Sequence, residues 1–241
     1  MKIVILDGYT LNPGDNPWDI LYPLGEVIVY DRTPDEQIID RALGAQVILT
    51  NKTPISRATI EALPELAYVG VLATGYNVVD INACRERGII VSNVPEYGTG
   101  AVAQYVFALI LELAHHVGRH AAAVAGGAWG RSGQFSFWET PQLELDGLTL
   151  GIVGYGRIGS RVATLGHAFG MNVIVHTRTP AQDAQVSHVS MSDVLERSDV
   201  VTLHCPSTPN TRNLINQQSL QAMKPASFLI NTARGDLVDE E

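Results

Sequence analysis

Short runs of apolar, mostly β-branched residues recur along the first hundred residues, and segments with helical spacing separate them. The runs are residues 3–6, 27–30, 47–50, 68–71 and 89–91. The helical segments between them include Thr33 to Leu43 and Ser56 to Leu63, where Ser56 is a plausible N-cap. Strands that alternate with helices predict a parallel sheet covered on both faces.

A second series of the same kind begins at Leu148. Its expected strands are 148–153, 172–176, a weak one near 188–190, 199–203 and 227–231, and its helices are 157–169, 192–197 and about 216–223. We therefore expect an α/β chain of two doubly wound parallel-sheet domains. Residues 1–97 would form a flavodoxin-like substrate domain, and residues 98–241 a Rossmann domain that binds NAD(P).

The two series are joined by a long apolar helix that starts near Thr99. Its run 101–113 contains Gln104 and Glu112 and is shorter than a membrane span, so it predicts a buried helix. The stretch 121–147 that follows is rich in small and aromatic residues. We expect a loop of this length and character to cover a surface, either that of a second subunit or that of its own domain.

A glycine fingerprint opens the second series, in the segment LTLGIVGYGRIG at 148–159. A buried strand that ends in a tight glycine turn and opens a helix can hold a dinucleotide pyrophosphate at the positive helix end. A lone GxGxxG is a weak signal, but here it stands in a strand–turn–helix context. The expected cofactor loop consists of Gly154, Gly156, Arg157, Ile158 and Gly159.

The next strand ends at His176, where an acidic residue would read the ribose hydroxyls of NAD. Thr177 and Arg178 follow in its place, and an arginine with hydroxyls suits the 2′-phosphate of NADP. This pattern favours NADP over NAD. The alternative is that Arg178 is a solvated loop residue and that His176 or Thr177 binds the ribose.

Composition narrows the classes of partner. The net charge of −9 and the pI near 5.2 argue against a nucleic acid or an anionic membrane as partner. The two cysteines, Cys84 and Cys205, suit a reducing compartment. The apolar run in the N-terminal segment MKIVILDG is too short for a signal peptide. We expect a cytoplasmic protein without a metal site.

Several ordered motifs together resemble one family. They are LGIVGYGRIG, SDVVTLHCPSTPNTRNLIN at 198–216, MKPASFLINTARGDLVDEE at 223–241, and the segment 73–111 that begins ATGYNVVD. They resemble the D-isomer-specific 2-hydroxyacid dehydrogenases, and SFWETPQLEL at 136–145 is similar to their glycerate dehydrogenase (hydroxypyruvate reductase) branch. The resemblance implies hydride transfer between a nicotinamide cofactor and a small 2-hydroxy or 2-keto acid, such as hydroxypyruvate or glyoxylate. A homodimer through residues 98–147 is expected.

The resemblance also implies roles for single residues. Arg234 would bind the carboxylate of the 2-keto acid and polarise its carbonyl, and the Thr74–Gly75 loop would hold that carboxylate through backbone N–H groups. The remaining cofactor contacts would be Thr99, Cys205, Pro206, Thr211, Thr232 and Ala233.

Each of these residues has a structural alternative. Arg234 could cap a helix or pair with Asp236 or Asp239, and Cys205 could be a small buried apolar residue. Thr99 could be a plain N-cap, and Thr74–Gly75 an ordinary glycine turn.

In the family a histidine donates the proton and a glutamate orients it, both downstream of the arginine that Arg234 matches. The sequence ends seven residues after Arg234, in the acidic Val238–Glu241 that is typical of a helix's first turn, so we expect it to be incomplete relative to its fold. None of the histidines His115, His116, His120 and His204 stands in the expected motif.

Because a general acid contributes about 10²–10⁴ in rate, little or no activity is expected of these 241 residues alone. Competing interpretations are a non-catalytic dinucleotide sensor or scaffold, and an oxidoreductase of the same fold that acts on formate or phosphite.

Overall fold

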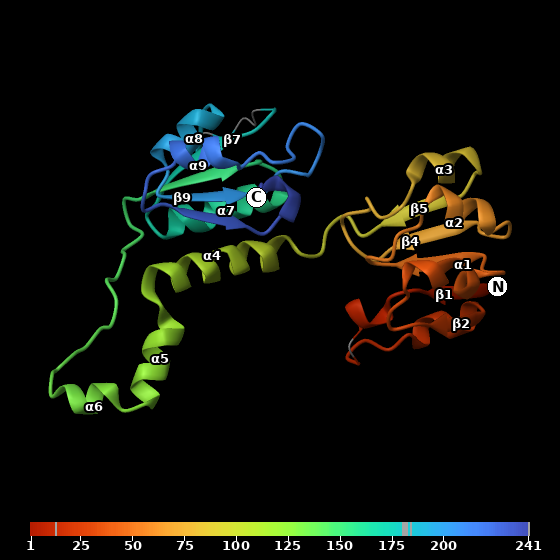
Figure 1. Ribbon diagram of the computed structural model, residues 1–241, viewed down its shortest axis with the longest axis horizontal. Helices are drawn as coiled ribbons and strands as arrows, with labels where there is room; N and C mark the ends of the chain where they lie inside the picture. Colours follow the sequence, from red (N-terminus) through yellow and green to blue (C-terminus); the bar gives the residue numbers. More distant parts are fainter. Residues whose placement is uncertain (13, 180–182, 184, 241) are drawn as a thin grey trace. The chain divides into compact units, whose positions relative to one another are not determined.

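The computed structural model describes residues 1–12, 14–179, 183 and 185–240. The chain divides into two compact units, Met1–Tyr97 and Gly98–Glu241 (Figure 1). Each unit is built around one parallel five-stranded sheet.

The first sheet has the strand order β2-β1-β3-β4-β5, so the chain reverses direction across the sheet at β1. Its strands are β1 (Lys2–Ile5), β2 (Glu26–Val29), β3 (Val47–Thr50), β4 (Tyr68–Val71) and β5 (Ile90–Asn93). Its helices are the 3₁₀ turns η1 (Gly8–Thr10), η2 (Asp19–Leu24) and η3 (Asp35–Gln37), followed by α1 (Ile38–Ala42), α2 (Arg57–Ala62) and α3 (Ile81–Glu86). Ser56 caps α2, because its side chain accepts a hydrogen bond from Thr59 N, as the sequence predicts.

Two clusters of side chains cover the two faces of this sheet. Val4, Ile48 and Val69 point to one face, where residues of α1, α2 and α3 pack on them. Ile3 and Ile5 point to the other face with Trp18. Because successive strand residues alternate between faces, the continuous apolar runs of the sequence correspond to strands buried on both sides.

The second sheet has the order β10-β9-β6-β7-β8. Its strands are β6 (Thr149–Val153), β7 (Asn172–His176), β8 (Ser187–His188), β9 (Val200–Leu203) and β10 (Phe228–Asn231). The helices of this unit are α4 (Thr99–His115), α5 (Val117–Ala125), α6 (Ala128–Ser132), α7 (Arg157–Ala168), α8 (Met191–Arg197), α9 (Gln217–Ala222) and the 3₁₀ turn η4 (Gly235–Leu237). The weak strand expected at 188–190 is thus only two residues long and lies at 187–188.

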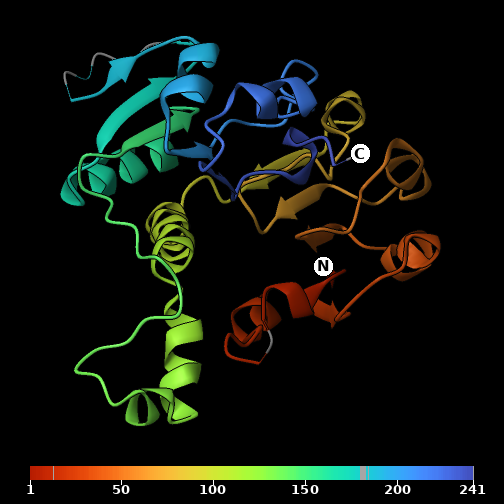
Figure 2. The ribbon, with the colours of Figure 1, turned by 60° about the vertical axis from the view of Figure 1, so that its left-hand side comes forward.

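Helices α4 and α7 lie on one face of this sheet, and α8 and α9 lie on the other (Figures 1 and 2). On α4 the buried residues follow helical spacing, from Ala103 through Phe107 to Ala114. Phe107 stacks on Phe169 at the end of α7, with ring centroids 5.0 Å apart. The apolar segment of the sequence is therefore a buried helix, as expected.

The expectation of one long loop over 121–147 is wrong for its first part, which is helical. Alanine-rich residues continue α5 as far as Ala125, because alanine has the highest helix propensity, and Gly127 then breaks the helix at φ 75°. Neither α5 nor α6 buries a residue, and Figure 1 shows both extending away from the β6–β10 sheet. These two helices therefore do not cover the sheet of their own unit, whereas Leu145, near the end of the stretch, is buried in the cluster that contains residues of α4 and α7.

The helix expected to begin at Val238 is also not found within the described residues, which end at Glu240. Val238 is extended, and the N–H of Asp239 donates to the carbonyl of Ile215 at 2.7 Å. That bond and the bridge between Ile215 and Val238 hold the segment beside the loop after β9.

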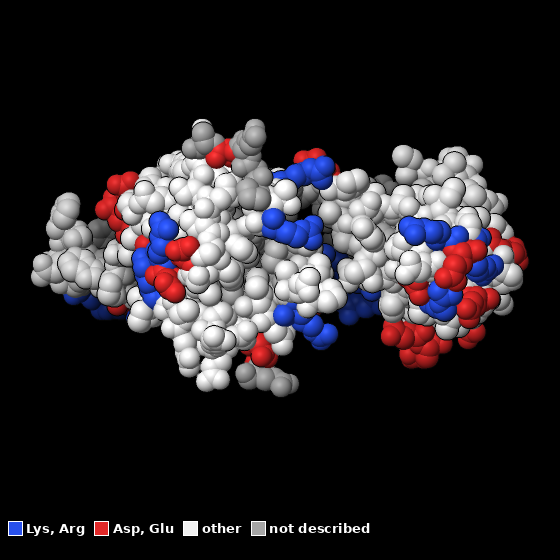
Figure 3. Space-filling view, turned by 90° about the horizontal axis from the view of Figure 1, so that it is seen from above, with Lys and Arg blue, Asp and Glu red and all other residues white. Residues whose placement is uncertain are grey.

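Charged side chains mix on the surface. In the first unit Arg57 pairs with Glu86, with 2.6 Å between Nη1 and Oε2, and also faces Asp80 and Glu61. The Glu86 contact raises the pKa of Arg57 and lowers that of Glu86. Figure 3 likewise shows acidic and basic side chains beside one another on the face in view. Around Arg57, opposite charges therefore offset one another.

Candidate active site

Three strand ends of the second unit meet at the glycine turn after β6. Gly154 donates its N–H to the carbonyl of His176, and His204 donates its N–H to the carbonyl of Val153 at 2.7 Å. Gly154 has φ 97°, and a Cβ built on it would lie 2.5 Å from the backbone nitrogen of Cys205. Only glycine fits here, because both the conformation and the close approach exclude a side chain. In this sheet β6 lies between β9 and β7, so the strand order reverses at β6. Ligands bind at such a point in open α/β sheets.

The three glycines of the fingerprint stand in different surroundings. A Cβ on Gly159 would overlap the carbonyl oxygen of Gly154, so this glycine lets α7 approach the strand. A Cβ on Gly156 would meet no atom within 4 Å, and its φ is −96°. No protein contact within the described chain therefore requires glycine at position 156.

Gly156 is also the N-cap of α7, and no side chain caps this helix end. The first turn continues with exposed Arg157 and half-buried Ile158. Open space above a glycine, together with an uncapped helix N-terminus, is the arrangement that accepts a phosphate.

The segment after β7 carries the residues predicted to select the cofactor. Thr177 is half-buried, and Arg178 is exposed and has no ion pair with another described residue. The sequence did not reveal a carboxylate nearby: Asp183 accepts a hydrogen bond of 2.6 Å from Tyr155 Oη. Burial and this bond raise the pKa of Tyr155 to about 12, and the same bond lowers the pKa of Asp183. In the sequence, this contact shows only as a tyrosine between two glycines of the fingerprint, Tyr155, whose hydroxyl needs a partner.

The segment after β9 contains His204, Cys205 and Pro206. Burial lowers the pKa of His204 to about 4, and its Nε2 lies 2.9 Å from Thr202 Oγ1. This imidazole is therefore neutral at neutral pH and does not act as a proton donor there. Burial raises the pKa of Cys205, which keeps it a thiol in contact with apolar neighbours.

Thr211, further along this segment, already has hydrogen-bond partners for its hydroxyl. The oxygen accepts from Thr208 N at 2.8 Å and donates to the carbonyl of Pro206 at 2.7 Å. This side chain shapes the loop, which fits a structural function for Thr211 as well as the predicted cofactor contact.

The segment after β10 places Thr232, Ala233 and Arg234 at the same edge. The hydroxyl of Thr232 is buried and has no hydrogen-bond partner among the described residues. Arg234 is exposed and donates through Nη1 to the carbonyl of Ala233 at 2.8 Å. In the described chain neither Asp236 nor Asp239 pairs with it, and Asp236 instead accepts from Ser207 Oγ at 2.6 Å. The salt-bridge alternative for Arg234 is therefore not what the structure shows.

Three predicted residues lie outside the strand-end segments of the second unit. Thr74 and Gly75 belong to the first unit, after β4, where Thr74 Oγ1 donates to the carbonyl of Val94 at 2.9 Å. Asn93 Nδ2 donates to the carbonyl of Thr74 at 2.8 Å and so fixes this turn from the other side. Thr99 is the first residue of α4, and Gly98 rather than Thr99 is the N-cap, so the N-cap alternative for Thr99 is wrong.

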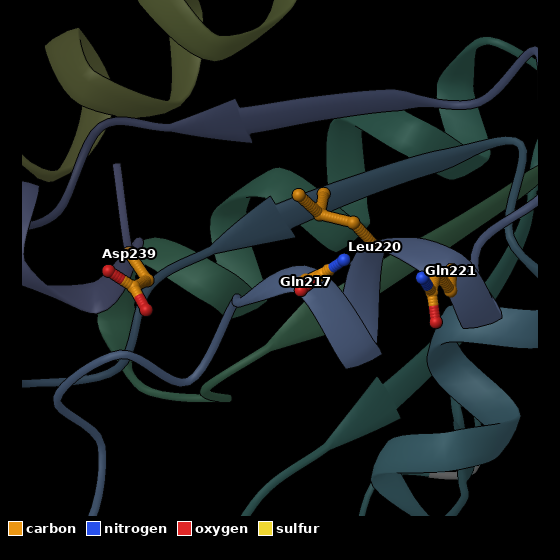
Figure 4. Close-up of a pocket in the computed structure, with 4 residues that line it drawn as sticks. All are labelled: Gln217, Leu220, Gln221 and Asp239. Atoms are coloured by element: carbon orange, nitrogen blue, oxygen red, sulfur yellow. The ribbon is translucent and has the colours of Figure 1, made fainter. Parts of the chain in front are cut away.

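A separate surface cavity of about 550 Å³ is lined by Gln217, Leu220, Gln221 and Asp239 (Figure 4). It contains none of the predicted site residues. Across the described ranges, no group of three or more His, Cys, Asp or Glu side chains could hold a metal ion. Among those residues no single helix is long and apolar enough to cross a membrane, although α4 and α5, which meet at a 59° bend, pass by length and composition when taken together.

The features of the second unit fit a dinucleotide. The glycine loop, Thr177–Arg178, Cys205–Pro206 and Thr232–Arg234 all follow the carboxyl ends of strands in one sheet. There is open space at Gly156, and the buried hydroxyl of Thr232 has no hydrogen-bond partner among the described residues. An α/β unit with a glycine turn at such a sheet edge is of the kind that binds nucleotides.

Comparison with known proteins identifies the family. Residues 107–241 match the family described as "D-isomer specific 2-hydroxyacid dehydrogenase, NAD binding domain", and the chain belongs to this family. It is therefore an oxidoreductase that uses a nicotinamide cofactor and a small 2-hydroxy or 2-keto acid.

Individual relatives match nearly the whole chain. A hydroxypyruvate reductase of Blautia hydrogenotrophica is 45% identical, and the match covers 100% of this chain and 77% of that protein. A glycerate dehydrogenase of Methylorubrum extorquens is 37% identical over 99% of this chain and 74% of that protein. Among solved structures, an acyclic imino acid reductase in complex with NADPH and D-Arg has a TM-score of 0.84 at 29% identity, covering 100% of this chain and 76% of that one.

Proposed function

We propose that this protein reduces hydroxypyruvate or glyoxylate to the corresponding 2-hydroxy acid. The observation that carries the proposal is the position of Arg234, which follows β10 at the same sheet edge as the glycine loop. Its guanidinium is exposed and free of acidic partners in the described chain. The names of the relatives, hydroxypyruvate reductase and glycerate dehydrogenase, support these substrates.

Arg234 suits a planar 2-keto acid. A guanidinium keeps its charge at all physiological pH values and donates two parallel hydrogen bonds to a carboxylate. A further donor near the keto oxygen would stabilise the negative charge that develops there during reduction. Thr74 and Gly75 of the first unit stay proposed substrate contacts, through the backbone N–H groups of their loop.

The nicotinamide cofactor supplies the hydride when it is bound. We propose that the first turn of α7 holds its pyrophosphate, with Gly156 leaving room for the phosphate oxygens. Cys205 and Pro206 would contact the nicotinamide side, and Thr232 offers a hydroxyl without a protein partner. Thr99, Thr211 and Ala233 stay proposed contacts.

We also propose that NADPH is preferred to NADH. Arg178 is the second residue after β7 and has no ion pair within the described chain, so its charge is available for a 2′-phosphate. Titration of intrinsic fluorescence with NADPH and NADH tests this choice in wild type and Arg178→Ala. The variant should lose NADPH affinity about tenfold and keep NADH affinity. An unchanged NADPH affinity would show that Arg178 does not read the phosphate.

Binding of the 2-keto acid is tested with oxamate, a planar 2-keto-acid analogue, titrated into the complex with NADPH. Arg234→Met should abolish oxamate binding, and Arg234→Lys should weaken it, because an ammonium lacks the planar fork. Both variants should bind NADPH with wild-type affinity. Equal oxamate affinity in wild type and Arg234→Met would refute the proposed role of Arg234.

A homodimer through residues 98–147 is the proposed assembly, in the cytoplasm. Phe135 is 97% exposed and Trp138 69% exposed, and α5 and α6 bury nothing, which leaves an apolar surface available to a second copy. Sedimentation equilibrium of wild type and of a Phe135→Ser, Trp138→Ser double variant tests it. The variant should be a monomer, and an unchanged mass would remove these residues from the interface.

A further inference from the structure

Asn231 is the last residue of β10, and its side-chain amide spans the turn that carries Arg234. The carbonyl oxygen Oδ1 accepts a hydrogen bond from the N–H of Ala233 at 3.1 Å. The amide nitrogen Nδ2 donates to the carbonyl of Arg234 at 2.8 Å. One side chain thus holds the backbone on both sides of the Arg234 Cα.

We propose that Asn231 is a positioning residue for Arg234, an inference that rests on the proposed binding of the substrate carboxylate by Arg234. Within the described chain, the one hydrogen bond that the guanidinium of Arg234 makes is to the carbonyl of its neighbour Ala233, so no side chain there orients it by a hydrogen bond or an ion pair. The direction of its side chain therefore depends on the backbone, which is extended at φ −143° and ψ 139°.

The two hydrogen bonds of Asn231 hold the two peptide groups on either side of the pair Ala233–Arg234. The bond to Ala233 N holds the Thr232–Ala233 peptide, and the bond to Arg234 O holds the Arg234–Gly235 peptide, so together they restrict the backbone angles of Ala233 and Arg234. On either side the chain is already anchored, by the pairing of Asn231 with Leu203 and by the turn η4 with the bridge from Val238 to Ile215. The carbonyl of Arg234 also accepts a longer hydrogen bond from Leu237 N at 3.3 Å. Asn231 adds the shorter bond to this carbonyl and the bond to Ala233 N, and so joins the end of β10 to the start of η4.

The hydrogen bonds of Asn231 involve the backbone of Ala233 and Arg234 but not the side chain of Thr232. The N–H of Ala233 is engaged by Asn231, whereas the hydroxyl of Thr232 is not engaged by any described residue. A loss of Asn231 should therefore disturb substrate binding more than cofactor binding. A merely structural asparagine would instead change stability and leave both affinities alone.

Two variants and a matched control test the proposal on the full chain. Asn231→Ala removes both hydrogen bonds, whereas Asn231→Asp keeps the acceptor for Ala233 and loses the donor to Arg234. The control is Asn172→Ala: Asn172 Nδ2 donates to the carbonyl of Gly147 at 2.8 Å, at the amino end of β7 and away from the site. Each protein is titrated with NADPH alone and then with oxamate in the presence of NADPH.

Asn231→Ala should weaken oxamate binding about tenfold while the NADPH affinity stays within twofold of wild type. Amide hydrogen exchange at residues 232–236 should become faster in this variant and stay unchanged in Asn172→Ala. Asn231→Asp should also weaken oxamate binding, because its carboxylate repels the carbonyl of Arg234. If Asn231→Ala folds poorly, the oxamate affinity of Asn231→Asp still tests the proposal.

Arg234→Met in the same series distinguishes the two ideas. If Arg234→Met abolishes oxamate binding and both Asn231 variants bind oxamate like wild type, the positioning role is overturned and the proposed function stands. If Arg234→Met binds oxamate like wild type, the proposed function and the positioning role both fall. Weaker oxamate binding in both Asn231 variants, with NADPH affinity retained, supports the proposal.

Discussion

The three glycines of the fingerprint can be separated by experiment into those that the fold needs and the one that the ligand needs. Gly154→Ala places a methyl group 2.5 Å from Cys205 N and forces a side chain to adopt φ 97°. The backbone conformation alone costs about 1–3 kcal/mol, and the ends of β6 and β9 must move apart as well. We expect a loss of stability at the upper end of that range or beyond it.

Gly156→Ala is the matched variant two residues away. Its φ of −96° suits any residue, and its Cβ meets no protein atom within 4 Å. The substitution should leave stability unchanged or raise it by up to about 1 kcal/mol, because alanine restricts the unfolded chain. The new methyl group would occupy the space proposed for phosphate oxygens, so NADPH affinity should fall at least tenfold.

Urea unfolding followed by circular dichroism measures the stability of each variant, and fluorescence titration measures its NADPH affinity. The reasoning is refuted if Gly156→Ala binds NADPH like wild type, because the open space would then not face the cofactor. It is equally refuted if Gly154→Ala unfolds at the wild-type urea concentration, because the close approach to Cys205 would then have no cost.

Three further outcomes follow from the same structure. Burial lowers the pKa of His204 from 6.5 to about 4, so between these pH values the unfolded chain binds a proton that the folded chain does not, and stability should fall by about 3 kcal/mol as the pH drops from 6.5 to 4. The urea midpoint should depend less on pH in His204→Gln, and an equal pH dependence in the two proteins would contradict this pKa shift. Asp7 is 4% exposed and accepts hydrogen bonds from the backbone N–H groups of Asn51 and Thr53, so Asp7→Ala should lower the free energy of urea unfolding by about 3 kcal/mol. A loss under about 1 kcal/mol would show that these hydrogen bonds contribute little to stability. A double-mutant cycle of Ser207→Ala and Asp236→Asn should give a coupling of at most about 1 kcal/mol, because both side chains are exposed, and a larger value would show a desolvated contact.

Much of the fold was predictable from apolar spacing. Strands buried on both faces leave continuous β-branched runs, and the runs at 47–50 and 68–71 coincide with the observed strands β3 and β4. The short β8 was predicted only roughly, because two residues carry little periodicity. The helices α5 and α6 were missed, because without a buried face they carry no regular stripe of large apolar residues in the sequence.

The candidate site was predictable to the extent that topology determines it. Residues that follow parallel strands meet at one sheet edge, which brings Arg234 and the glycine loop to the same side. The contacts that shape the site depend on side-chain conformation and on partners far along the chain. Tyr155 with Asp183, 28 residues apart, is such a contact, and no spacing rule links the two.

A residue at this sheet edge indicates ligand binding when no protein contact explains the open space beside it or when its polar atoms have no protein partner. Gly154 and Gly159 are explained by backbone approach, and the hydroxyl of Thr211 is engaged by its own loop. Gly156 is not explained in this way, and neither is the buried hydroxyl of Thr232. Because an unpartnered buried hydroxyl costs about 1–3 kcal/mol, its retention is understandable if a bound molecule satisfies it. These two positions, rather than the glycine pattern as a whole, are therefore where cofactor binding should be most sensitive to substitution at the least cost in stability.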